Sequence, residues 1–86
     1  MVRENRCDEF AQTLGFADFE VLLRASELVI GERDIDWFVA KLPDGRWVAW
    51  DDTLDLGRVA YFASREAAVQ HHLDTARLYY GGQDYL

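Results

Sequence analysis

Acidic residues are concentrated in one stretch of the chain, residues 32–55, where they could bind a positively charged partner. Six acids lie toward the two ends of this stretch: Glu32, Asp34, Asp36, Asp51, Asp52 and Asp55. The first three alternate, and alternate residues of a β-strand project from one face at intervals of about 6.6 Å. The pattern therefore predicts an array of carboxylates that imitates the spaced phosphates of a nucleic acid.

The residues between the two acidic groups predict a β-hairpin. The segment Leu-Pro-Asp-Gly, which ends at Gly45, fits a type I turn with this glycine in the left-handed conformation. In the resulting register Asp36 lies opposite Asp52, and Trp37 lies opposite Asp51. Like charges directly opposite each other destabilise a sheet, so folding alone gives no reason for the first pair.

Two interpretations of these acids stay open. Either they form a binding surface, or they are solvated strand ends with Arg33 and Arg58 as counter-ions. The formal net charge is −7, and most of it comes from residues 27–55. Such a chain is repelled by phosphate backbones and anionic membranes, so we expect no direct binding to either. The expected partner is a basic protein, which could belong to a nucleic-acid-binding complex.

Few residues suit catalysis or metal binding. His71 and His72 are the only histidines, and neighbours on a helix project about 100° apart, so they cannot share a metal ion. Cys7 is the only cysteine; it lies on the expected apolar face of a helix, where a thiol acts as a small buried hydrophobe. We therefore expect no metal, no cofactor and no enzymatic activity. A lone cysteine also favours a reducing, cytoplasmic location.

The hydrophobic periodicity predicts a single compact α+β domain over residues 1–86. Two short helices are expected near the N-terminus, the second starting after Asp18 and running through Val29 to Gly31. A three-stranded antiparallel meander and a C-terminal helix capped by Ser64 should follow, at 35–42, 46–51, 58–63 and 65–80. The apolar stripe of the last helix is predicted at Val69, Leu73, Ala76 and Tyr80.

The predicted strands are apolar on both faces, unlike strands of a sheet that is solvated on one side. Either helices of the same chain cover both faces, or one face meets a partner or a second copy. In the second case the protein should be a homodimer or should expose a group of rings among Trp37, Trp47, Trp50 and Tyr61.

These patterns favour a non-enzymatic, acidic protein-interaction domain that occupies a basic site on a partner. In size and charge alone the chain resembles small acidic inhibitors, encoded by phages or mobile elements, that block CRISPR or restriction systems, some of them as nucleic-acid mimics. The expected contact residues are the six acids together with Trp37, Trp47 and Trp50. One alternative is a regulatory or accessory subunit that binds through an apolar sheet face. A second alternative is a small enzyme that uses His71 or His72.

Overall fold

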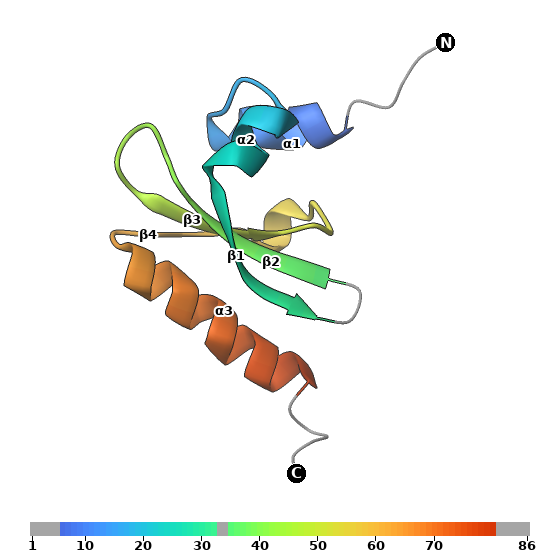
Figure 1. Ribbon diagram of the computed structural model, residues 1–86, viewed down its shortest axis with the longest axis vertical. Helices are drawn as coiled ribbons and strands as arrows, with labels where there is room; N and C mark the ends of the chain where they lie inside the picture. Colours follow the sequence, from blue (N-terminus) through green and yellow to red (C-terminus); the bar gives the residue numbers. More distant parts are fainter. Residues whose placement is uncertain (1–5, 33–34, 81–86) are drawn as a thin grey trace.

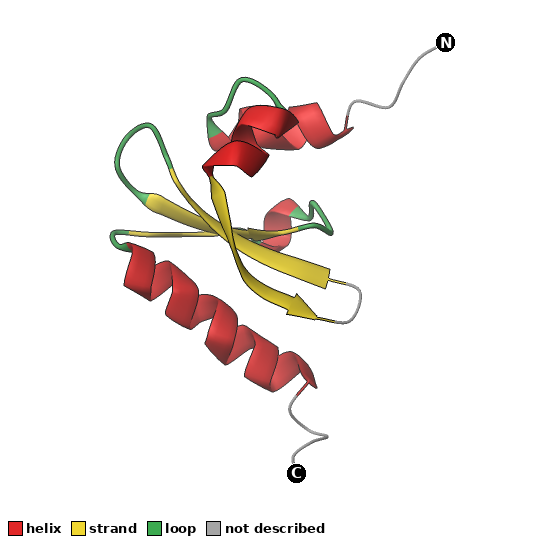
Figure 2. Cartoon of the chain, viewed as in Figure 1, coloured by secondary structure: helices red, strands yellow, loops and turns green. Residues whose placement is uncertain are grey.

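Four antiparallel strands form the central layer of the structure, and helices pack against both of its faces (Figures 1 and 2). The computed structural model describes residues 6–32 and 35–80. Its elements, in chain order, are α1 (Arg6–Leu14), α2 (Phe19–Ala25), β1 (Ser26–Glu32), β2 (Ile35–Lys41), β3 (Trp47–Asp51), the 3-10 helix η1 (Leu56–Arg58), β4 (Ala60–Phe62) and α3 (Arg65–Tyr80). The strands lie in the order β1-β2-β3-β4. The predicted α+β class is confirmed, with four strands in place of three.

The prediction that the second helix continues through Val29 to Gly31 was wrong, because α2 ends at Ala25 and the segment that follows forms strand β1. Ser26 takes an extended backbone conformation, and its hydroxyl donates to the Leu22 carbonyl oxygen at 2.6 Å. Val29 and Ile30 are β-branched residues that suit a strand. Pairing with β2 then gives the backbone groups of this segment their hydrogen-bond partners, with a register irregularity between Leu28 and Ile30.

The hairpin between β2 and β3 agrees with the predicted turn and register. The Leu42 amide donates to the Arg46 carbonyl oxygen at 2.7 Å, and the Gly45 amide donates to the Leu42 carbonyl oxygen at 2.9 Å. Gly45 has φ 96°, as the left-handed turn position requires. Trp37 pairs with Asp51. The next strand, β4, is shorter than the predicted 58–63, because Arg58 belongs to η1 and the strand covers only Ala60–Phe62.

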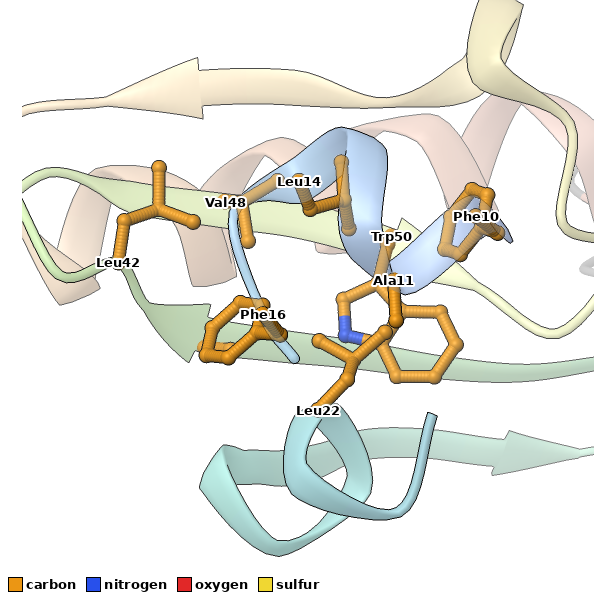
Figure 3. Close-up of a cluster of buried hydrophobic side chains, with 9 residues drawn as sticks. Phe10, Ala11, Leu14, Phe16, Leu22, Leu42, Val48 and Trp50 are labelled. Atoms are coloured by element: carbon orange, nitrogen blue, oxygen red, sulfur yellow. The ribbon is translucent and has the colours of Figure 1, made fainter. Parts of the chain in front are cut away.

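Helices α1 and α2 bury one sheet face around Trp50, which has no exposed surface. Figure 3 shows apolar side chains of both helices gathered at this ring, with Leu22 reaching it from α2 and Phe10 from α1. The indole Nε1 of Trp50 donates to the Ser26 hydroxyl oxygen at 3.0 Å, so the polar atom of the ring is satisfied within the core. Cys7 is exposed at the start of α1, contrary to the prediction that it is buried.

Helix α3 covers the opposite face and begins where predicted, with the Ala67 amide donating to the Ser64 hydroxyl oxygen at 3.1 Å. The predicted stripe holds in part: Val69 packs against the core, whereas Leu73 is 43% exposed and the Tyr80 side chain lies outside the described residues. The fully buried residues in the described part of α3 are Ala68 and His72, which were not predicted. The small Ala68 side chain lets α3 approach closely a sheet face on which the rings of Trp47 and Phe62 also pack. Among the described helices, none combines the length and the apolar character that a membrane span needs.

Candidate functional site

The six predicted acids do not form one continuous exposed group. Asp36, Asp52 and Asp55 are exposed, whereas Asp51 is buried with 3% of its surface accessible. Asp34 and the side chain of Glu32 lie outside the described residues. The prediction that Glu32 and Asp36 alternate along one strand was wrong, because Glu32 ends β1 and pairs with Ile35 at the start of β2. The structure therefore brings three of the candidate carboxylates to the surface and turns a fourth into the interior.

Asp36 and Asp52 are neighbours across the β2–β3 pair, as the predicted register requires. The Asp52 amide donates to the Asp36 carbonyl oxygen at 3.1 Å, which extends the ladder beyond β3. Residue alternation places Asp36 on the sheet face that α1 and α2 cover further along. Asp55 lies at the end of the following turn, where its Oδ1 accepts from the Gly57 amide at 2.9 Å. None of these three carboxylates forms an ion pair within residues 6–32 and 35–80.

Asp51 is part of an internal ion pair, so its predicted place in the exposed array was wrong. The Arg58 Nε donates to Asp51 Oδ2 at 2.8 Å. The amide and hydroxyl of Thr53 both donate to Asp51 Oδ1, at 3.1 and 2.5 Å. The physical reason is strand alternation: Ala49 and Asp51 point to the face that α3 covers, and their neighbour Trp50 points to the other face. The counter-ion role suggested for Arg58 is therefore confirmed.

The tryptophans predicted as contact residues lie largely in the interior. Trp37 and Trp50 are 1% and 0% exposed, and Trp47 is half-buried. Tyr61 is the exposed ring of the predicted group, at 43%, and the Arg46 guanidinium lies 4.8 Å from its centroid. Helices of the same chain cover both sheet faces, which explains why the strands are apolar on both sides. The expected exposed aromatic group was therefore wrong for Trp37 and Trp50.

His72 is a buried structural histidine, with 2% of its surface accessible. Its Nε2 lies 2.7 Å from the Phe38 carbonyl oxygen, so this nitrogen is protonated and donates. Its Nδ1 is buried and has no hydrogen-bond partner in the part of the chain that the structure describes. The ring meets Trp37 edge to face at 5.3 Å. Burial lowers the pKa of His72 below its ordinary value, and the Phe38 hydrogen bond opposes this shift in part.

The lowered pKa predicts that acid destabilises the fold. Below about pH 6.5 the unfolded chain binds a proton at His72 before the folded chain does, so the free energy of unfolding should decrease as the pH falls. The slope contributed by one such group reaches about 1.4 kcal/mol per pH unit. Urea unfolding between pH 7 and pH 5.5 should show it. The slope should vanish in His72→Gln and persist in His71→Gln; an equal slope in His72→Gln would assign it to other groups.

A cavity of about 300 Å³ lies between α3 and the segment that leads from η1 into β4. Its lining residues are Trp37, Asp51, Gly57, Arg58, Val59, Ala60, His71, His72 and Thr75. Sequence reasoning did not bring the Asp51–Arg58 pair together with the two histidines, because the residues come from segments far apart in the chain. No cluster of three or more His, Cys, Asp or Glu residues able to hold a metal ion occurs in the described ranges.

Comparisons of the chain with protein-family models, with curated proteins and with solved structures found no match. The function must therefore be inferred from the residues and contacts of this chain.

Proposed function

We propose that this chain is a non-enzymatic, acidic interaction domain that binds a basic surface on another protein. The observation that supports the proposal most is the adjacency of Asp36 and Asp52. One of these exposed carboxylates lies on β2 and the other directly follows β3, their backbones are joined by a hydrogen bond, and neither forms an ion pair within the described residues. Their mutual repulsion costs stability, and a cationic partner would relieve it.

The distribution of the basic residues supports the same proposal. Four arginines form ion pairs with acids elsewhere: Arg24 with Glu20, Arg46 with Asp44, Arg58 with Asp51 and Arg65 with Glu27. Their charges are therefore partly neutralised where they are. No described cation forms an ion pair with Asp36 or Asp52, so in a chain of net charge −7 these two carboxylates can attract a basic surface.

The most specific form of the proposal is an inhibitor, from a phage or another mobile element, that occupies the nucleic-acid site of a CRISPR, restriction or similar protein. Carboxylates on a rigid β-hairpin are held at fixed spacing, and such an arrangement can replace phosphates on a basic surface. The proposed surface is centred on Asp36 and Asp52 and includes the exposed Asp55 of the following turn. The expected contributions of Glu32 and Asp34 concern side chains outside the described residues.

The alternative of an accessory subunit that binds through an apolar sheet face has lost its main support. That alternative needs an open apolar face, and α1, α2 and α3 cover both faces. The enzyme that uses His71 or His72 also has little support. The Nε2 of His72 is bound to the Phe38 carbonyl oxygen and its Nδ1 is buried, and the His71 ring contacts the rings of Phe62 and His72. Neither alternative is supported by a contact as specific as the Asp36–Asp52 adjacency.

Charge reversal of the surface tests the proposal. The variant Asp36→Lys/Asp52→Lys should lose binding to the basic partner by about 100-fold, corresponding to roughly 1.4 kcal/mol for each reversed charge. Its thermal stability should be unchanged or higher, because the repulsion across the strand pair is removed. Partner capture from the native host, followed by affinity measurements with the purified partner, would provide the values.

A matched control separates the local surface from the net charge. Glu9→Lys/Asp74→Lys changes the net charge equally at two exposed helix positions and should bind almost as the parent does. Parent binding should weaken as salt rises, and nucleic acid should compete for the partner. If the Asp36/Asp52 variant binds as tightly as the parent, these acids are solvated strand ends and the proposal is wrong.

A further inference from the structure

We propose that the cavity between α3 and the Gly57–Ala60 segment is a binding site for a small organic carboxylate. Its volume of about 300 Å³ lies at the lower end of the range for small-molecule sites. The cavity opens on the α3 side of the sheet, whereas Asp36 belongs to the opposite face. The inference is therefore separate from the protein-binding surface proposed above.

The polar wall of the cavity is held rigidly. The Arg58 guanidinium is bound to Asp51 through Nε, and its Cζ lies 5.5 Å from the centroid of the Trp37 ring. Thr53 in turn fixes the other oxygen of Asp51 with two hydrogen bonds. A buried ion pair gives little net stability compared with apolar residues of the same volume. Its presence at a cavity wall is better explained by ligand recognition, because a guanidinium already held in place loses little entropy on binding.

The lining of the cavity carries no net negative charge, in contrast to the chain as a whole, so an anion is not repelled there. Asp51 is the acid among the lining residues, and Arg58 balances its charge. His71, which is half-buried, adds an imidazole that can donate a hydrogen bond to a carboxylate. Burial holds the pKa of His72 below its ordinary value, although the Phe38 hydrogen bond opposes this, so His72 adds little positive charge to the lining. An anion in the cavity thus meets cationic and donor groups without a net negative charge nearby.

The remaining walls favour an apolar body on that anion. Val59, Ala60 and the Trp37 ring line the cavity beside the polar groups. The ligand class that fits both walls is a small carboxylate with an aromatic or aliphatic body. Benzoate is a suitable probe, and benzamide is its neutral counterpart of almost the same shape.

Titration of the ¹⁵N-labelled full chain tests the proposal by NMR. Benzoate should bind with Kd of about 1 mM, which is typical of a ligand of this size. The shifted signals should be the amides of Gly57–Ala60 and the indole N–H of Trp37. Benzamide should bind about tenfold more weakly, because it lacks the charge-assisted hydrogen bonds of a carboxylate. Equal affinity for the two probes, shifts scattered over other surfaces, or no shifts well above 1 mM would overturn the proposal.

Variants place the site and distinguish it from the protein-binding surface. His71→Gln and Arg58→Gln should each weaken benzoate binding about fivefold or more, whereas Arg77→Gln, at an exposed position of α3 outside the cavity, should leave it unchanged. Since Arg58→Gln leaves Asp51 without its cation and could unfold the chain, His71→Gln is the decisive variant. The Asp36→Lys/Asp52→Lys variant should bind benzoate as the parent does. Unchanged benzoate binding in His71→Gln would contradict the proposed role of that side chain and overturn the assignment.

Discussion

Replacing Trp50 with alanine should lower the free energy of unfolding by about 3–5 kcal/mol, the usual cost of deleting a large buried ring. The ring has no exposed surface and contacts three others: Phe38 stacked at a centroid distance of 4.5 Å, Phe10 at 5.6 Å and Phe19 at 5.8 Å. Its removal leaves a cavity that the short α1 and α2 helices cannot fill. Since domains are commonly stable by only about 5–15 kcal/mol, the variant should be largely unfolded at moderately raised temperature.

Urea unfolding followed by far-ultraviolet circular dichroism would measure this effect without relying on tryptophan fluorescence. Tyr61→Ala is the control, because that ring is 43% exposed on β4 and should contribute much less. Trp50→Phe should recover part of the loss while leaving the Ser26 hydroxyl without its donor. A loss below about 1.5 kcal/mol for Trp50→Ala would mean that the α1–α2 layer does not depend on this ring.

Arg58→Met should destabilise the fold by about 2–4 kcal/mol, because it leaves the Asp51 carboxylate buried without its cation. The lower end of this range allows for the 30% exposure of the Arg58 side chain, which lets water screen part of the interaction. Methionine keeps an apolar side chain beside the Trp37 ring, so the decrease in the free energy of unfolding reports mainly the loss of the Arg58 charge. The same urea unfolding experiment would measure it.

The double variant Arg58→Met/Asp51→Asn distinguishes an unpaired charge from lost packing. Asparagine is neutral and can still accept hydrogen bonds from Thr53, so the double variant should be more stable than Arg58→Met alone. Arg77→Met is the control, because its side chain is exposed on α3 and forms no ion pair within the described ranges. If the double variant is the less stable of the two, the loss comes from packing against Trp37.

Local chemistry alone determined the β2–β3 hairpin. Pro43 and Gly45 restrict the backbone at the turn, and the turn sets the register of every later pair, including Trp37 with Asp51. The start of α3 was also predictable, because a serine side chain can satisfy a free amide of the first helical turn at short range. Because the turn sets the register of the hairpin, the proximity of Asp36 to Asp52 was also predictable without knowledge of any other element.

Contacts between distant segments decided the rest. Residues 26–29 continue a helical pattern in the sequence, but they belong to β1 because β2 offers them an edge, which local periodicity cannot reveal. Strand apolarity left open what covers the sheet, and only the packing of α1, α2 and α3 determined that Trp37 and Trp50 are buried. Asp51 is predictable as the partner of Trp37 across the β2–β3 pair. Its burial depends on Arg58, seven residues later, and on α3. The period of a strand assigns side chains to two faces, and the tertiary structure decides which of those faces meets solvent.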